Sequence, residues 1–312
     1  MGVDAATTEF LISGMKIGIV PGRVCTLGRQ QLFCPPRRIK ALLRKYGIDA
    51  KGDYAVQATR FAEDLFSRLG FLSCDSVDAS DYESATIVHD LNRPVADDLH
   101  ERFDLVLDGG TLEHVFNFPV ALKNAMEMTK VEGALVIHNC MNNLAGHGFY
   151  QFSPELFYRA LSGDNGFRVV RMFVYAREGE AYSVADPADV RGRVQLINDA
   201  ATHILVHAER TRRAEIFAAS PQQSDYAQNW ESASRAPPGA DDGPVKKALR
   251  RRLSPKNVAR ISAALNVVRQ KRAVRRVLRE ASLANRKLYT PVSSWAVRRP
   301  QAWDRATSKS QP

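Results

Sequence analysis

The chain has 312 residues, of which 45% are hydrophobic and 25% charged, and its net charge is +10. This composition suffices for a normal buried core and predicts about two structural units. Residues 1–20 contain Asp4, Glu9 and Lys16 and no long apolar run. We therefore expect neither a signal peptide nor a membrane span, and a cytoplasmic protein.

The positive charge is confined to the C-terminal part of the chain. Residues 243–312 hold 19 Lys and Arg against Glu280 and Asp304 and carry +17, whereas residues 1–242 carry −7. Any binding to a polyanion therefore belongs to this tail. Its apolar residues recur at roughly helical spacing, which predicts a basic helical extension over residues 245–312. We expect this tail to bind one of three partners, which are an anionic membrane surface, another protein or the main domain. Nucleic acid is a further alternative.

The four cysteines are scattered along the chain. None forms a Cys-x-x-Cys pair, and no histidine lies near one at zinc-finger spacing. We predict buried free thiols and no metal site.

Between residues 23 and 217, short β-branched runs alternate with helix-like segments, which is typical of an α/β sheet with helices on both faces. The predicted strands are Val24–Leu27, Leu72–Val77, Ala85–His89, Phe103–Leu107, Ala134–His138, Phe167–Tyr175 and His203–Ala208. The predicted helices are Arg37–Tyr46, Ala55–Leu69, Pro119–Thr129 and one that begins at Pro154 behind the cap Ser153. Residues 1–22 are predicted to be an N-terminal extension and residues 218–244, rich in Ser, Gln, Pro and Gly, a linker.

The strand over Phe103–Leu107 is followed by Asp108, Gly109 and then the pair Glu113-His114. This run resembles the fourth strand and following loop of class I S-adenosylmethionine-dependent methyltransferases. The helix, turn and strand that follow, up to residue 138, continue the resemblance in the same order. It implies a Rossmann-like, seven-stranded, mostly parallel sheet with a last antiparallel strand. It also implies S-adenosylmethionine as the cofactor, with Asp108 and Gly109 beside it.

Two carboxylates follow the second and third predicted strands. Asp78 matches the family's ribose-binding residue, since one ionised carboxylate can accept hydrogen bonds from two neighbouring hydroxyls. Asp81 is the alternative at this turn. By the same resemblance, Asp90 and Leu91 contact the adenine, or else Asp90 only caps the loop at residues 92–94.

The loop after the first strand departs from the family pattern. The family has three glycines here, whereas this chain keeps only Gly28 in the run Thr26–Gln31. Gly28 still permits close backbone approach to a cofactor. Gln30 is predicted to bond the methionine carboxylate or amine, with Arg29 as a charge partner, or else a larger side chain fills the pocket.

The segment Asn139–Phe152 follows the fifth strand, where the family places acceptor-binding residues. His147 and Tyr150 are candidates for this role, whereas Phe149 and Phe152 are predicted to pack on the core. His138, on the strand, is interpreted as a core histidine.

Methyl transfer requires a positioned acceptor, and a base if that acceptor is a hydroxyl. His114 is the first candidate for the base, because imidazole titrates near neutral pH, and Glu113 and His147 are the others.

The sequence thus predicts methyl transfer to a small molecule or glycan precursor. The alternative is a non-catalytic methyltransferase-like binding module that is anchored through its basic tail. The altered glycine loop favours this alternative.

Overall fold

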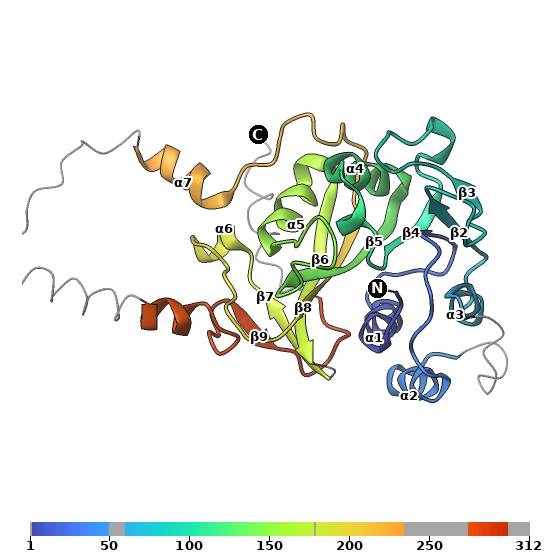
Figure 1. The fold of residues 1–312 in the computed structure, drawn as a ribbon, viewed down its shortest axis with the longest axis horizontal. Helices are drawn as coiled ribbons and strands as arrows, with labels where there is room; N and C mark the ends of the chain where they lie inside the picture. Colours follow the sequence, from blue (N-terminus) through green and yellow to red (C-terminus); the bar gives the residue numbers. More distant parts are fainter. Residues whose placement is uncertain (1, 50–59, 178, 234–273, 299–312) are drawn as a thin grey trace, which may run out of the picture.

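The computed structural model describes residues 2–49, 60–177, 179–233 and 274–298. Through these residues runs a nine-stranded sheet in the order β3-β2-β1-β4-β5-β8-β6-β7-β9 (Figure 1). Its strands are β1 (Arg23–Leu27), β2 (Ser73–Asp78), β3 (Ile87–Val88), β4 (Phe103–Asp108), β5 (Thr129–Asn142), β6 (Phe167–Arg177), β7 (Glu180–Val184), β8 (Thr202–Arg210) and β9 (Tyr289–Pro291).

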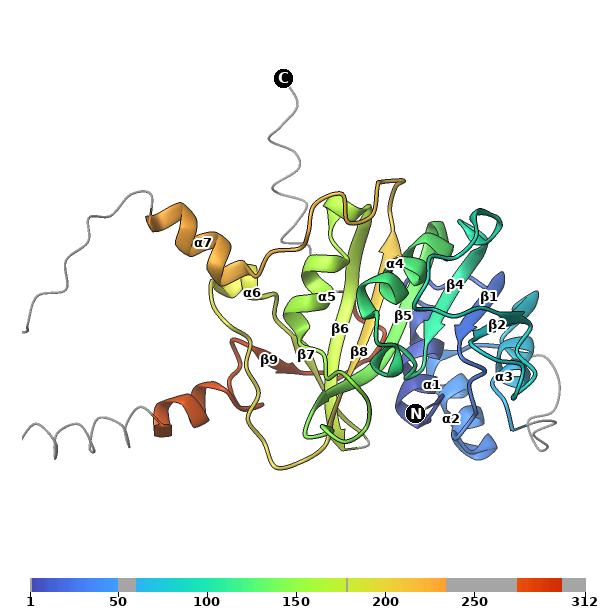
Figure 2. The ribbon, with the colours of Figure 1, turned by 45° about the horizontal axis from the view of Figure 1, so that its top comes forward.

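Strands β1 to β5 pair in parallel, and β8 lies antiparallel between β5 and β6 (Figure 2). The order reverses between β1 and β4, as in doubly wound α/β folds. The predicted Rossmann-like fold with an antiparallel last strand is therefore confirmed. The two strands beyond the predicted seven are β7, with five residues, and β9, with three.

Helices cover both faces of the sheet. The helices are α1 (Ala5–Gly14), α2 (Pro36–Tyr46), α3 (Glu63–Arg68), α4 (Phe118–Met128), α5 (Pro154–Ala160), α6 (Pro187–Val190) and α7 (Ser224–Ala233). One core lies under α4 and α5 and the other under α1, α2 and α3. Within β4, Leu105 and Leu107 belong to the second core and Val106 to the first, because successive strand residues face opposite sides.

The helix ends follow the predicted signals where these residues are described. Ser153 caps α5 by accepting a hydrogen bond from the Leu156 amide, as predicted. The helix expected over 55–69 is too long, because α3 begins only at Glu63, and the preceding residues 60–62 are described and not helical, with Phe61 forming an isolated β-bridge to Gln31. Residues 50–59 lie outside the described ranges. The segment expected as a linker contains α7, and residues 234–244 lie outside the described part of the chain.

The predicted N-terminal extension contains α1, which is buried against the sheet. Asp4 caps it by accepting a hydrogen bond from the Thr7 amide at 2.7 Å. The Thr7 hydroxyl and the Tyr175 hydroxyl each lie 2.8 Å from one ring nitrogen of His138. Burial lowers the pKa of His138 to about 4, so the imidazole is neutral. His138 is thus a satisfied core histidine, in agreement with the sequence interpretation.

Part of the basic tail also packs into the fold. The buried Arg171 donates hydrogen bonds to the Ser13 hydroxyl at 2.9 Å and to the carbonyls of Phe10 and Trp295. The Trp295 ring meets Phe10 and Phe173 edge-on, at centroid distances of 6.4 and 5.8 Å. A single arginine therefore joins α1, β6 and the C-terminal segment.

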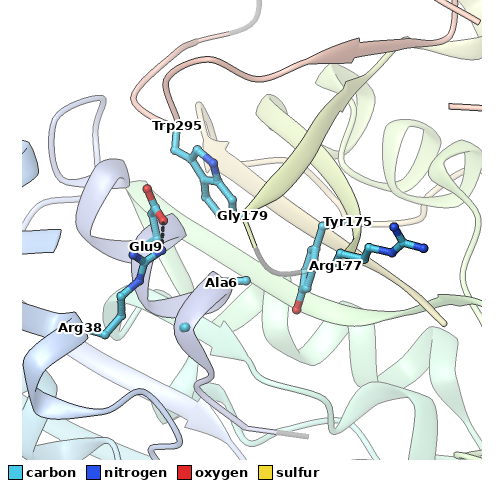
Figure 3. Close-up of a pocket in the computed structure, with 8 residues that line it drawn as sticks. Ala6, Glu9, Arg38, Tyr175, Arg177, Gly179 and Trp295 are labelled. Atoms are coloured by element: carbon cyan, nitrogen blue, oxygen red, sulfur yellow. Dashed lines mark hydrogen bonds and ion pairs between the residues drawn. The ribbon is translucent and has the colours of Figure 1, made fainter. Parts of the chain in front are cut away.

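Figure 3 shows Trp295 beside α1, with the ion pair Glu9–Arg38 next to it. Together with Tyr175 and Arg177 these side chains border a depression too narrow for a water-sized molecule. This region is packed structure, and we place no ligand there.

The basic clusters of the tail at residues 246–252 lie outside the described ranges, so the partners expected for it stay predictions. Among the described residues, no helix is long and apolar enough to cross a bilayer.

Replacing Trp295 with Ala tests whether the C-terminal segment belongs to the fold. The indole is only 6% exposed, so its removal leaves a cavity and should lower the free energy of unfolding by about 3–5 kcal/mol in a denaturant titration. Val297→Ala is the matched control, because Val297 is 48% exposed and should change stability little. Equal denaturation midpoints for Trp295→Ala and the wild type would show that the C-terminal segment does not pack against the rest of the fold.

Candidate active site

The carboxyl ends of β1, β2, β4 and β5 form one edge of the sheet, at the point where the strand order reverses. Ligands of doubly wound sheets bind at such a point. Leu27 at the end of β1 is in register with Val77 on one side and Asp108 on the other. The residues that follow these strands are therefore brought together, as the sequence predicted.

Gly28 has a left-handed backbone, with φ of +68°, and its N–H donates to the Val77 carbonyl at 2.7 Å. A Cβ atom at this position would lie 2.9 Å from the Thr111 hydroxyl and 3.8 Å from Oδ2 of Asp78. The chain therefore needs glycine here, both for the backbone conformation and because a side chain would clash with Thr111, and the position lies beside the Asp78 carboxylate.

Gln30 is buried in the loop after β1, at this edge of the sheet. Its buried amide nitrogen donates to the Leu27 carbonyl and, at 3.2 Å, to the Thr111 hydroxyl. Its Oε1 covers Gly109, where a Cβ atom would lie only 2.4 Å from that oxygen. Arg29, by contrast, is held by Glu63 at 2.6 Å, so the guanidinium is engaged by α3.

Asp108 is fully buried and organises the loop after β4. Its Oδ1 accepts hydrogen bonds from the backbone amides of Gly110, Thr111 and Leu112, at 2.8–3.3 Å. Its Oδ2 accepts from Nδ2 of Asn139 at 2.9 Å. Burial raises the pKa of this carboxyl to about 6. These internal contacts make Asp108 a residue that positions the loop, and its predicted contact with a cofactor stays a prediction.

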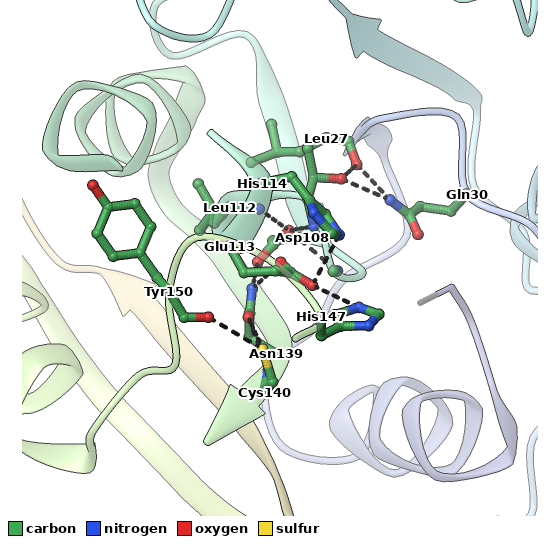
Figure 4. A network of polar contacts seen from close by, with 12 residues as sticks. Leu27, Gln30, Asp108, Leu112, Glu113, His114, Asn139, Cys140, His147 and Tyr150 are labelled. Carbon is green, nitrogen blue, oxygen red and sulfur yellow. Dashed lines mark hydrogen bonds and ion pairs between the residues drawn. The ribbon is translucent and has the colours of Figure 1, made fainter. Parts of the chain in front are cut away.

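Glu113 is carried by this loop, in the short 3₁₀ helix η2 (Leu112–His114), and is also fully buried. Its Oε2 accepts from the same Asn139 amide at 2.8 Å. Burial and the neighbouring Asp108 raise its pKa to about 7. Its Oε1 has no hydrogen-bond partner among the described residues. This oxygen lies 3.7 Å from Nε2 of His114 and 3.5 Å from Nε2 of His147 (Figure 4).

The loop after β5 brings His147 to this position by docking on the main chain of Glu113. The Phe149 amide donates to the Glu113 carbonyl at 2.8 Å, and a Cβ atom on Gly148 would lie 2.7 Å from that carbonyl oxygen. The rings of His114 and His147 lie 5.2 Å apart, and their side chains are 47% and 32% exposed. Partial burial lowers the pKa of both histidines. The structure thus gathers the three residues predicted as candidates for the base.

The aromatic residues of the same loop divide between core and surface. Phe152 is buried, as predicted, and Tyr150 donates its hydroxyl to the Phe116 carbonyl at 2.7 Å. The prediction for Phe149 is wrong, since its side chain is 67% exposed. The close approach of the glycine-flanked loop to Glu113 turns this ring outward, against Phe116.

Asp90 forms the local turn that the sequence offered as the alternative to an adenine contact. Its Oδ1 accepts from the backbone amide of Asn92 at 3.0 Å and from the side-chain amide at 2.7 Å, which lowers the pKa of the exposed carboxyl. Leu91 is buried in the core. An adenine contact at these two residues stays a prediction.

The residue that sequence reasoning missed is Asn139. It stood in the acceptor loop without a role, yet its buried amide bridges Asp108 and Glu113. The only sequence signal is a polar amide directly after an apolar strand.

No family model and no curated protein matches this chain. Several solved structures are similar to it. They include the 1,6-didemethyltoxoflavin-N1-methyltransferase of Burkholderia thailandensis, with bound 1,6-didemethyltoxoflavin and S-adenosylhomocysteine (13% identity, 67% of this chain and 79% of that chain, TM-score 0.39). The N-methyltransferase NodS of Bradyrhizobium japonicum is another (12% identity, 66% and 94%, TM-score 0.35).

A third is the branched-chain polyamine synthase of Thermus thermophilus, in complex with N4-aminopropylspermidine and 5'-methylthioadenosine (13% identity, 70% and 59%, TM-score 0.35). Because these TM-scores are low, the fold and the site are assigned from the strand order and the side-chain positions described above.

Replacing Asn139 with Leu should destabilise the protein in a pH-dependent way. The folded-state pKa values of Asp108 and Glu113, about 6 and about 7, lie above the ordinary values of 3.8 and 4.5. Ionisation of these two carboxyls therefore lowers the free energy of unfolding as the pH rises from about 4 to 7. The hydrogen bonds from Asn139 lower both pKa values, so their removal makes the loss of stability at high pH larger. We expect a cost of roughly 3–6 kcal/mol at pH 8 and a smaller one at pH 5 in urea titrations.

Asn124→Leu is the control, because this buried amide bonds only neutral groups, the Val95 amide and the carbonyls of Leu91 and Arg93. Its cost should be the same at both pH values. A pH-independent cost for Asn139→Leu would contradict the proposed bridge between charged groups.

Proposed function

We propose that this chain is an S-adenosylmethionine-dependent methyltransferase that acts on a small molecule or glycan precursor. The observation that carries the proposal is the joint position of Gly28, Asp78 and Glu113 at the edge where the strand order reverses. A glycine with a left-handed backbone, the carboxylate proposed to bind the ribose and a group of titratable side chains lie there together.

The chain's own residues would hold the cofactor at this edge. Asp78 lies beside Gly28, and its carboxylate would hold the two ribose hydroxyls. Oε1 of Gln30 would be the acceptor for the cofactor's ammonium group, because the Leu27 carbonyl already accepts hydrogen bonds from Gln30 and Thr111. Asp90 and Leu91 would lie at the adenine. When bound, S-adenosylmethionine supplies an electrophilic methyl group.

The protein's remaining tasks are to orient the acceptor and to take up its proton. His114 has a lowered pKa and is therefore a neutral imidazole at pH 7, ready to accept a proton from a hydroxyl or an ammonium acceptor. Oε1 of Glu113 lies 3.7 Å from Nε2 of His114, and the carboxylate in its ionised form would stabilise the imidazolium that forms. His147, on the facing loop, is placed to orient the acceptor or to share the proton.

One observation favours a non-catalytic binding module instead. The amide of Gln30 is bonded to Leu27 and Thr111 and packs over Gly109, so it takes up space that glycines leave open in the family's loop. Calorimetry with S-adenosylhomocysteine separates the two functions. Micromolar binding supports the enzyme, and no binding at millimolar ligand supports the binding module.

Asp78→Ala should weaken S-adenosylhomocysteine binding by about tenfold to several hundredfold, because each hydrogen bond to a carboxylate contributes roughly 1.5–3 kcal/mol. Asp81→Ala is the control, since Asp81 is exposed and should have little effect. If Asp81→Ala abolishes binding and Asp78→Ala is silent, the carboxylate has been misassigned.

The variant Gln30→Ala tests whether the Gln30 side chain contacts the cofactor or blocks its binding. If Oε1 of Gln30 accepts a hydrogen bond from the cofactor, its loss should weaken S-adenosylhomocysteine binding by about twofold to tenfold in calorimetry, as for a single neutral bond. Tighter binding by the variant would mean that the amide occupies the cofactor's place.

A further inference from the structure

Three potential metal ligands meet at the edge of the sheet. Oε1 of Glu113 and one ring nitrogen each of His114 and His147 all lie within 4.8 Å of one another, and no other such group occurs among the described residues. Metal bonds of about 2.0–2.2 Å require ligand atoms about 3.0–3.4 Å apart. The separations from Glu113 are 3.7 Å to His114 and 3.5 Å to His147, so small side-chain movements would bring these atoms into range.

The state of the Glu113 carboxylate is a second, independent observation. Buried polar atoms nearly always have a hydrogen-bond partner, yet the buried Oε1 has none among the described residues. Its distances to the two histidines are too long for hydrogen bonds. The other oxygen is held by Asn139 at 2.8 Å, which fixes Oε1 toward the imidazoles (Figure 4).

We propose that Glu113, His114 and His147 bind a divalent first-row transition-metal ion through Oε1 and the two Nε2 atoms. Two imidazoles and one carboxylate suit Zn²⁺, Fe²⁺, Mn²⁺ or Co²⁺, whereas Mg²⁺ and Ca²⁺ prefer oxygen ligands throughout. Asn139 is the positioning residue, as it orients the carboxylate from behind.

Such a site explains why the histidines stay partly exposed while the glutamate is buried. Three protein ligands leave the remaining coordination positions open, and the exposed sides of His114 and His147 place these positions toward the solvent. If the proposed methyltransferase function holds, an acceptor oxygen would bind there, and the metal ion, which lowers the pKa of a bound hydroxyl, would replace His114 as the group that promotes loss of the acceptor's proton. The metal site itself does not depend on that function. It departs from the sequence prediction of no metal, which rested on cysteine spacing.

The test uses the full chain, with any affinity tag removed and metals stripped by a chelator. Zn²⁺ and Co²⁺ are titrated in calorimetry without S-adenosylmethionine, and the Co²⁺ complex is followed by its visible absorption. We expect one bound equivalent, with no competition from millimolar Mg²⁺. His114→Ala, His147→Ala and the isosteric Glu113→Gln should each weaken binding at least about tenfold, while circular dichroism shows that they fold.

His100→Ala is the matched control. His100 also pairs with a glutamate, Glu127, at 3.5 Å, but it precedes β4 and so lies at the opposite edge of the sheet. Its loss should leave binding unchanged. The proposal is overturned if the ions do not bind below millimolar concentration, or if the three variants bind as well as the wild type. Because no cofactor is present, failure of methyl transfer and failure of metal binding are separate results.

Discussion

The candidate site depends on one buried amide. Nδ2 of Asn139, near the carboxyl end of β5, donates one hydrogen bond to Asp108 and one to Glu113. Asp108 in turn holds three backbone amides of the loop after β4, and the Glu113 carbonyl receives the loop that carries His147. β4 and β5 are already paired through their backbones, and the Asn139 side chain adds a link from β5 to Asp108 and to Glu113. This link positions the two loops that carry Glu113, His114 and His147.

This arrangement costs stability. Two neighbouring carboxyls without a cationic partner are removed from water, and both have raised pKa values for that reason. A protein under selection for stability alone would place apolar or neutral groups there. Perturbed carboxyls concentrated at a ligand-binding edge are instead typical of functional sites. The buried Arg171 is different, because its bonds to α1 and to the C-terminal segment serve the packing of the fold.

The sequence predicted what local patterns encode. The seven principal strands, the Ser153 cap and the meeting of Gly28, Asp78 and Glu113 all follow from apolar runs that end in polar or glycine residues. The burial of α1 and of Trp295 was not predictable, because it depends on long-range contacts through Arg171. The role of Asn139 and the approach of His147 to Glu113 depend on how two loops dock, and no sequence periodicity reports that.

We propose that the cofactor binds where the strand order reverses, between β1 and β4. Hydrogen–deuterium exchange with and without S-adenosylhomocysteine locates the contact along the chain without assuming which residues make it. We expect exchange to slow in the segments 27–31, 76–79 and 109–113. Unchanged exchange in all three segments at saturating ligand, or protection confined to α6 and α7, would contradict it.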